Sequence, residues 1–408
     1  MSIFQAADIL LPENTDMYKW AVIACDQFTS DEGYWQRVRQ TVGQAPSTLH
    51  MILPEAELKD LKQDVIGKIN CTMERYWNSG LFHTYEKAYV YVERTQENGS
   101  IRKGILGMVD LEAYDYRPGT EPLVRATEQT VLERIPPRKQ VRKDAMLEFP
   151  HVLMLCDDEK KQLVESVEAI RDSLPVLYDF DLMEDGGHIC GRLVAGQAAK
   201  DFDRRLADYT AHFEEKYADL SGGKVLLAVG DGNHSLATAK SCYEDRKAAG
   251  DPQAALARYA LVELENIHDD ALEFEAIHRV LTGVDTEKLL ADLRILCAEE
   301  GFPVTCVSKG KSETVFLNRK YGELAVAVLQ PFLDDWLAEN GGKIDYIHGE
   351  EALIGFAQAD GAMGFLLPSM EKQELFRGVI SGGVLPRKTF SMGHAREKRY
   401  YLEGRRIK

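Results

Sequence analysis

A short glycine-rich loop between a predicted strand and a predicted helix carries the residue types best suited to chemistry. Its residues are Gly230, Asp231, Gly232, Asn233 and His234, and Ser235 follows them. The glycines allow a tight turn and the close approach of a ligand. The next helix offers free N–H groups and a positive dipole end, which suit a phosphate or a carboxylate. Asp231 and His234 form an acid–base or metal-binding pair, and Ser235 or Thr238 could donate a further hydrogen bond.

The same pattern also fits a purely structural turn. In that interpretation Ser235 is the N-cap of the helix, and His234 bonds to the backbone. Glycine-rich turns are common in proteins, so the residue pattern alone leaves both interpretations open.

A second group of residues centres on Thr127 and Glu128. Arg125 precedes this pair, and Arg134 and Arg138 follow it. A carboxylate presented beside arginines suits a ligand that contains a metal and a phosphate. Thr127 and Glu128 would equally well start a helix, and the pair would then be a cap.

Two further cationic groups lie later in the chain. His278 and Arg279 follow an apolar run, and Arg387 and Lys388 follow a Gly-Gly turn. Arg279 and Lys388 are the predicted cations for charge that develops on a bound group. The alternatives are a surface pair or a satisfied core pair for the first group and a solvated basic turn for the second.

Hydrophobic patterning places these residues on predicted elements. The segment 224–229 is a buried strand and 236–247 a helix, with the glycine-rich loop between them. Segments 88–94 and 101–110 form a hairpin around Asn98-Gly99. Other segments are predicted as follows: strands at 20–25, 176–183, 188–194, 258–265, 312–318 and 324–328, and helices at 54–79, 197–220, 285–300, 329–339 and 371–380.

This order of elements predicts an α/β (α+β) protein with mixed sheets and flanking helices. With 408 residues, the chain is long enough for two or three lobes. Composition changes divide it into an N-terminal α/β domain (1–150), a central domain that carries the loop (151–285) and a C-terminal α/β segment (286–408).

Composition limits the classes of partner. A net charge of −17 opposes general binding to nucleic acid, because a phosphate backbone requires a surplus of Lys and Arg. Apolar runs such as 225–229 are far shorter than the roughly 20 residues of a membrane helix. Seven cysteines without CxxC spacing, and an N-terminus unlike a signal peptide, predict a cytoplasmic protein. The oligomeric state stays open, a homodimer included.

Taken together and in this order, these stretches resemble the domain-of-unknown-function family 1015. The stretches that carry the resemblance are Ala24–Phe28, Thr127–Thr130, Asp231–Ala239, His278-Arg279 and Gly382–Thr389. The loop is also similar to that of the ParB/sulfiredoxin-like superfamily, which includes free-serine kinases, so the resemblance implies a ParB/sulfiredoxin-like core. Ser235 stands where the broader motif has an arginine, which removes a cation from the loop.

The resemblance implies phosphoryl transfer on a small-molecule substrate, serine or phosphoserine, in the kinase or the phosphatase direction, with a nucleotide (ADP or ATP) and Mg²⁺. In this hypothesis the loop holds the phosphate, and Asp231 or His234 is the general base. Glu128 binds Mg²⁺ or orients the substrate, while Arg279 and Lys388 neutralise charge. The alternative is a non-catalytic regulatory protein that binds a nucleotide or an amino acid with the same loop.

Overall fold

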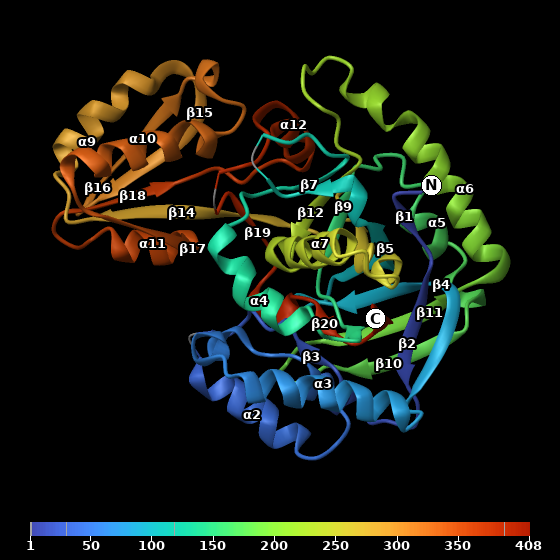
Figure 1. Cartoon of the computed structure of the whole chain (residues 1–408). Helices are drawn as coiled ribbons and strands as arrows, with labels where there is room; N and C mark the ends of the chain where they lie inside the picture. Colours follow the sequence, from blue (N-terminus) through green and yellow to red (C-terminus); the bar gives the residue numbers. More distant parts are fainter. Residues whose placement is uncertain (1, 30, 118, 387) are drawn as a thin grey trace.

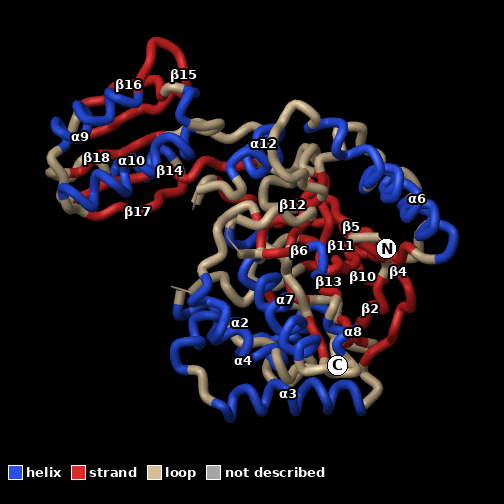
Figure 2. The backbone as a smooth tube through the Cα atoms, turned by 45° about the horizontal axis from the view of Figure 1, so that its top comes forward, coloured by secondary structure: helices blue, strands red, loops and turns tan. Residues whose placement is uncertain are grey.

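The protein consists of a large body built on one mixed sheet and a smaller lobe built on a second sheet (Figure 1). The structure, a computed structural model, describes residues 2–29, 31–117, 119–386 and 388–408. The smaller lobe projects from the large body at the upper left of Figures 1 and 2. The predicted α/β class with mixed sheets is confirmed.

The large sheet has the strand order β10-β11-β4-β5-β13-β9-β12-β7-β6, with β1 against β5 and β2 against β4. Its strands are β1 (Phe4–Gln5), β2 (Ala7–Pro12), β4 (Phe82–Thr95), β5 (Ile101–Asp110), β6 (Tyr114–Asp115), β7 (Val124–Ala126), β9 (Leu153–Cys156), β10 (Val176–Asp181), β11 (His188–Val194), β12 (Leu227–Asp231) and β13 (Tyr259–Asn266). The pairs β12–β7, β13–β9 and β6–β7 are parallel, and the other neighbours are antiparallel.

Both faces of this sheet are covered, and β4 shows how the sequence arranges this. Successive side chains on a strand point to opposite faces. Val90 and Val92 therefore belong to one core cluster, while Tyr89 and Tyr91 belong to another on the opposite face. The predicted hairpin from β4 to β5 is confirmed, and Gly99 takes a φ of +81° in its turn.

Helices from the N-terminal segment pack on the face of Val90, and helices from the middle of the chain pack on the face of Tyr89. The first set is α1 (Met17–Trp20), α2 (Glu32–Val42) and α3 (Gln63–Asn78), beside the short strand β3 (Val22–Ile23). The second set is α5 (Val164–Glu168), α6 (Gly196–His212), α7 (Asn233–Ala248) and α8 (Ala254–Ala257). α4 (Ile135–Arg142) lies beside α7.

The smaller lobe has the strand order β16-β15-β18-β14-β17, with β19 against β14. Its elements are β14 (Phe274–Thr282), α9 (Thr286–Leu293), β15 (Cys297–Ser308), β16 (Lys311–Leu317), α10 (Ala325–Asn340), β17 (Lys343–His348), α11 (Glu350–Phe356), β18 (Ala362–Leu366) and β19 (Phe390–Met392). α12 (Lys372–Gly382) lies beside β7 of the large body, where the Arg125 side chain donates to the Val379 carbonyl at 3.2 Å (Figure 1). Val304, Leu329 and Phe365 are fully buried in its core.

The chain then returns to the large body. β20 (Tyr400–Tyr401) pairs with β3, and β21 (Arg405–Arg406) pairs with β8 (Leu147–Glu148). The indole N–H of Trp20 donates to the carbonyl of Leu402 at 2.8 Å. The last residues are therefore part of the large body and not of the smaller lobe.

Several sequence-based boundaries differ from the structure. The predicted boundary at 150 falls inside the large sheet, and the smaller lobe begins at β14, before the predicted boundary at 285. The predicted strand 324–328 is wrong, because these residues begin α10. The predicted helix 285–300 ends early, since β15 starts at Cys297. Apolar runs of this length fit a buried strand or a buried helix turn equally well.

No helix within the described part of the chain combines the length and the apolar character that crossing a bilayer requires.

Candidate active site

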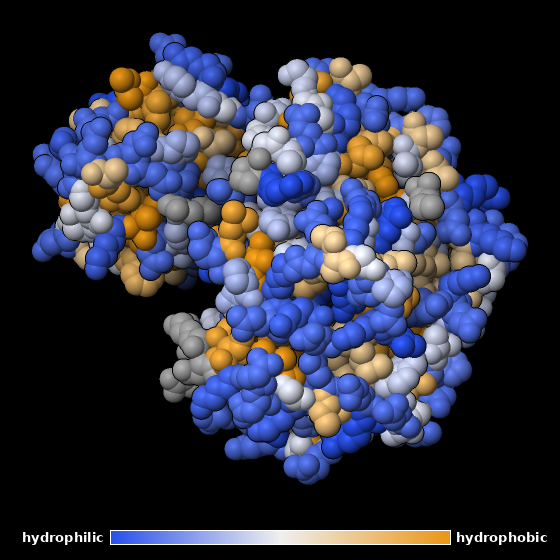
Figure 3. Space-filling model, viewed as in Figure 1, coloured by the Kyte–Doolittle hydropathy of each residue, from blue (hydrophilic) through white to orange (hydrophobic). Residues whose placement is uncertain are grey.

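A cavity of about 880 Å³ lies where the large sheet, the N-terminal segment, the smaller lobe and the last residues meet. Pockets for small ligands and cofactors run from roughly 300 to 1,000 Å³, so the space suits a ligand of nucleotide size. The predicted site residues that line it are Glu128, Gly230, Asp231, Gly232, Asn233, His234, Ser235, Thr238 and Lys388. Figure 3 shows the surface hollowed between the smaller lobe and the lower part of the body.

The glycine-rich loop presents an uncapped helix start to this cavity. Gly232 is the N-cap residue of α7 with a φ of +82°, and no side chain among the described residues caps the helix. A Cβ atom at Gly232 would lie 3.0 Å from Val152, so both conformation and space favour glycine there. Ser235 lies inside the helix, and its predicted alternative role as N-cap is wrong. The free N–H groups of the first turn can therefore bind an anion.

Thr238 lines the cavity, but its hydroxyl is already used. It donates to the backbone carbonyl of His234 at 2.7 Å, one helical turn earlier. This bond is the usual one for a threonine inside a helix. Thr238 therefore forms part of the cavity wall, and its hydroxyl proton is not free for a ligand.

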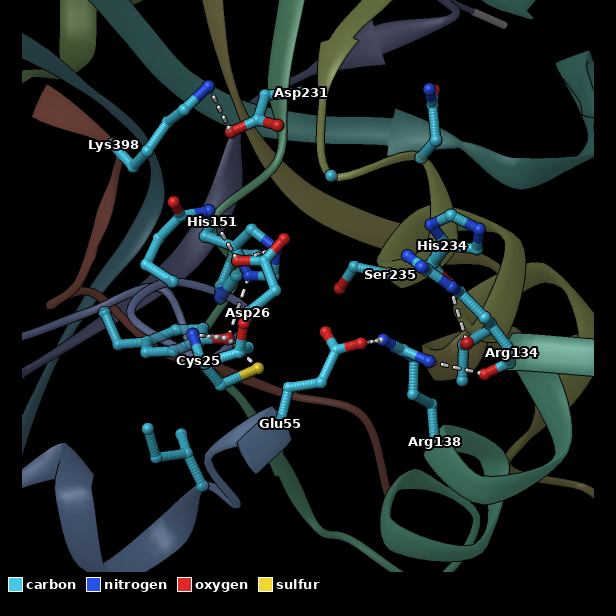
Figure 4. Close-up of a pocket in the computed structure, with 18 of the residues that line it drawn as sticks. Cys25, Asp26, Glu55, Arg134, Arg138, His151, Asp231, His234, Ser235 and Lys398 are labelled. Atoms are coloured by element: carbon cyan, nitrogen blue, oxygen red, sulfur yellow. Dashed lines mark hydrogen bonds and ion pairs between the residues drawn. The ribbon is translucent and has the colours of Figure 1, made fainter. Parts of the chain in front are cut away.

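Glu128 and Asp231 bring two carboxylates to the same wall. Burial raises the pKa of Glu128, with the charge of Asp231 adding to the rise, while Lys388 opposes it. Lys388 has a φ of +57°, and the backbone N–H groups of Lys388 and Thr389 bond to the Glu128 carboxylate. Asp231 Oδ2 lies 3.5 Å from Lys398 Nζ (Figure 4). Arg387, noted beside Lys388 in the sequence, lies outside the described residues.

His234 is held in one tautomer by the backbone. The N–H of Val131 donates to His234 Nε2 at 3.2 Å, so a neutral ring carries its proton on Nδ1. Burial, followed by the charges of Arg138 and Arg134, lowers the pKa of His234 to about 4. At neutral pH the ring is uncharged, and the lone pair that would accept a proton already accepts a hydrogen bond. These features make His234 a poor general base.

A titration of the His234 ring tests this environment. We expect the ring to stay neutral as the pH falls from 7 to about 5, because its pKa of about 4 lies below the usual value of 6.5. The unfolded chain binds that proton earlier, so this residue makes the protein less stable as the pH falls from 6.5 toward 4. Side-chain NMR of the ring and urea unfolding at several pH values measure both effects.

The matched variant for this titration is His234→Gln, whose side-chain oxygen still accepts the N–H of Val131. It should lose the part of the pH dependence that His234 causes. A ring that titrates near 6.5 in the folded protein would contradict the expectation.

Four further residues that carry chemistry line the cavity, and the sequence patterns did not predict them as site residues. Asp26 follows β3, His151 precedes β9, and Lys398 and Tyr401 come from the last segment. The Tyr401 hydroxyl donates to Cys25 Sγ at 3.0 Å and bonds to His151 Nδ1 at 2.8 Å. Although burial opposes ionisation, the proximity of His151 holds the pKa of Asp26 below its usual range. The only sequence signal was the loose family resemblance of the segment around Asp26.

Cys25 lines the cavity but is not a nucleophile in this state. Burial raises the pKa of its thiol to about 12, with the charge of Asp26 adding to the rise. The thiol therefore stays protonated at neutral pH, whereas the thiolate is the reactive form.

Two predicted cations lie elsewhere. Arg279 is fully buried on β14, where its Nε donates to Gln330 at 3.0 Å and its guanidinium stacks on Tyr346. Arg125 is also buried, and it bonds to the backbone carbonyls of Val379 and Gly223. Neither arginine lines the cavity. This placement does not support the predicted role of Arg279 on a bound phosphate.

No group of three or more His, Cys, Asp or Glu side chains within the described ranges is arranged to hold a metal ion. Mg²⁺ is commonly held by one or two carboxylates together with phosphate oxygens of the substrate. Glu128 and Asp231 fit that smaller requirement, since both line the cavity and their charges interact.

Three solved structures are similar to this chain at a distance. Free serine kinase in complex with AMP has a TM-score of 0.37 at 12% identity, with 72% of this chain and 90% of that chain covered. SbnI with a C-terminal truncation, from Staphylococcus aureus, has a TM-score of 0.37 at 10% identity, with 71% and 82% covered. A conserved hypothetical protein from Pyrococcus furiosus has a TM-score of 0.33 at 12% identity, with 72% and 90% covered. Likeness at this level carries no conclusion about activity.

Sequence comparison identifies the family more directly. No curated protein matches the chain. A family model described as protein of unknown function (DUF1015) matches residues 7–352, which include the loop, Glu128 and most of both sheets. The resemblance drawn from the sequence is thereby confirmed, while a ParB-like core stays a prediction. The chain belongs to the DUF1015 family.

Proposed function

We propose that this protein transfers a phosphoryl group between a nucleotide and the hydroxyl of a small substrate. The observation that carries the proposal is that an uncapped helix start and two carboxylates share one cavity of nucleotide size. Phosphoryl transfer needs little covalent chemistry from the protein. It requires a cradle for the phosphates, neutralisation of charge and a group that orients or deprotonates the attacking hydroxyl.

The first turn of α7 supports binding of the transferred phosphate. The residues from Gly232 to Ser235 line the cavity, no described side chain caps the helix there, and the helix dipole favours negative charge at this end. Lys388 and Lys398 border the same space. In the proposal they balance charge that develops on the phosphoryl oxygens.

Glu128 is the proposed contact for Mg²⁺. Burial raises the pKa of this carboxyl, and a nearby divalent cation would favour its charged form. When bound, Mg²⁺ supplies charge neutralisation at the phosphate oxygens. Glu128 would hold the ion beside the loop, and the charge of Asp231 acts on the Glu128 carboxylate.

Asp231 is the proposed general base. Its Oδ2 atom is buried and accepts no hydrogen bond from the described residues, and Lys398 Nζ lies 3.5 Å away. In the kinase direction the substrate oxygen attacks the terminal phosphorus of ATP while its proton passes to Asp231. The bond to the ADP oxygen then breaks. His234 is less suited, because its Nε2 already accepts the N–H of Val131.

The proposed substrate class is serine or phosphoserine, which the family resemblance implies. Phosphorus NMR of the purified protein with Mg²⁺ and phosphoserine, with and without ADP, tests the proposal. We expect the phosphoserine signal to decay only with ADP and to give ATP. Decay to inorganic phosphate without ADP would assign a phosphatase activity instead.

Glu128→Gln and Glu133→Gln are a matched pair of variants for this assay. Glu128 lines the cavity, whereas the neighbouring Glu133 is exposed and does not. Loss of the Mg²⁺ contact should lower turnover by about 10²- to 10³-fold in Glu128→Gln, as with other groups that stabilise charge. Glu133→Gln should behave as wild type. Binding of ADP without turnover in any direction would favour the non-catalytic regulatory function.

A further inference from the structure

The cations that line the cavity differ in how their charge is balanced. Arg138 pairs with Glu55 at 2.5 Å, Arg142 pairs with Glu148, and Lys398 lies 3.5 Å from Asp231. The charge of Lys388 acts on the carboxylate of Glu128. Among the described residues no carboxylate forms an ion pair with Arg134, although its side chain lines the same cavity. An unbalanced guanidinium at a cavity wall is available for an anionic ligand.

A chain of hydrogen bonds places Arg134 at the start of α7. The N–H of Val131 donates to His234 Nε2 at 3.2 Å, and the N–H of Arg134 donates to the Val131 carbonyl at 3.1 Å. Arg138 Nη1 donates in turn to the Arg134 carbonyl at 2.7 Å. The backbone of Arg134 is thus tied to the loop on one side and to α4 on the other. Figure 4 shows its side chain beside His234 and Ser235.

Three sources of positive charge meet at this point and face the cavity: Arg134, Arg138 and the N–H groups at the start of α7. Their effect is visible in His234, since after burial the charges of Arg138 and Arg134 contribute most to lowering its pKa. Arg138 already pairs with Glu55, whereas the planar fork of Arg134 is left for a ligand. Phosphate oxygens match that fork better than any neutral group.

We propose that Arg134 binds a phosphate group of the nucleotide across the start of α7, and that His234 is the positioning residue that holds Arg134 there. This inference rests on the proposed function for the identity of the ligand. Arg134 comes from α4 and not from the glycine-rich loop, so it supplies from a neighbouring helix a cation that the loop, with Ser235, does not contain.

Calorimetric titration with inorganic pyrophosphate, and separately with ADP, tests the role of Arg134. We expect Arg134→Ala to bind both probes about 10- to 100-fold more weakly, the usual effect of one charge-assisted hydrogen bond. Arg134→Lys keeps the positive charge but lacks the planar guanidinium, so its affinity should lie between those of wild type and Arg134→Ala. Arg204→Ala, which removes an exposed arginine on α6, is the control and should bind as wild type.

A pair of His234 variants tests the positioning role. His234→Gln can still accept the N–H of Val131, whereas His234→Ala cannot. We expect the glutamine variant to bind pyrophosphate nearly as wild type and the alanine variant to lose as much affinity as Arg134→Ala. In Arg134→Ala, the further change His234→Ala should then have little additional effect, because the two residues act through one contact.

Two results would overturn the inference. One is pyrophosphate and ADP binding by Arg134→Ala with wild-type affinity. The other is a wild-type protein that binds neither probe. Failure of the proposed function would look different. The wild type would then bind ADP, Arg134→Ala would bind it more weakly, and yet no phosphoserine would be turned over.

Discussion

Asp231→Asn is expected to lower the rate of phosphoryl transfer by about 10²- to 10⁴-fold, the usual contribution of a general base. The amide has nearly the same shape as the carboxylate but cannot accept the substrate proton. Asp231 Oδ2 is buried and accepts no hydrogen bond from the described residues, so the change does not break a structural contact of that kind. Turnover of phosphoserine and ADP, followed by phosphorus NMR, measures the loss.

Binding separates this role from a structural defect. Asp231→Asn removes a negative charge 3.5 Å from Lys398, so in the absence of Mg²⁺ an anionic nucleotide should bind at least as tightly as to wild type. Asp245→Asn, on the exposed part of the same α7 helix, is the matched control and should keep full activity. If Asp231→Asn kept full turnover and His234→Gln lost most of its turnover, His234 and not Asp231 would be the general base.

Arg399→Met is expected to destabilise the folded protein by about 3–5 kcal/mol, because it leaves buried carboxylates without a counter-charge. Arg399 is 2% exposed and lies 2.5 Å from Glu263 and 2.6 Å from Glu403. Although burial disfavours its charge, Glu403 and Glu263 raise the pKa of Arg399 above its ordinary value. The free energy of unfolding from urea titrations measures this loss.

The control is Arg294→Met, which breaks an exposed ion pair with Glu313 and should cost less than about 1 kcal/mol. Replacing Glu263 by Gln in the Arg399→Met background should restore part of the stability, because one uncompensated charge is then removed. Equal destabilisation in Arg399→Met and Arg294→Met would contradict the expectation. Lys398 precedes Arg399 in the chain. The loss of the Arg399 ion pairs in Arg399→Met should therefore also weaken the contact between Lys398 and Asp231.

The local parts of the fold were predictable from sequence because local patterns determine them. Alternation around Asn98-Gly99 predicts the hairpin of β4 and β5, and the strand before Gly230 and the helix after it are both present. Where the pattern is ambiguous the prediction was wrong, as for the apolar residues at the start of α10. The start of α7 at Asn233 depends on the left-handed conformation of Gly232. The sequence did not show this, because Ser235 was an equally good candidate for the N-cap.

The candidate site was only half visible in the sequence. The loop and Glu128 stand out because residue types that suit an anion and a metal follow a strand or a glycine turn. Asp26, His151 and Lys398 reach the same cavity from three distant segments. Apart from the loose family resemblance around Asp26, nothing in the neighbouring sequence marks these residues as part of a site. Their grouping depends on contacts between segments far apart in the chain.

The sequence by itself determined the family, the mixed α/β class and the loop that faces the cavity. Only the tertiary structure decided which cations accompany that loop. Arg279 turns into the core of the smaller lobe, while Arg134 is held beside His234 by backbone hydrogen bonds. The physical reason is that periodicity sets which face of an element is buried, whereas the direction of a charged side chain depends on the partners that folding brings to it.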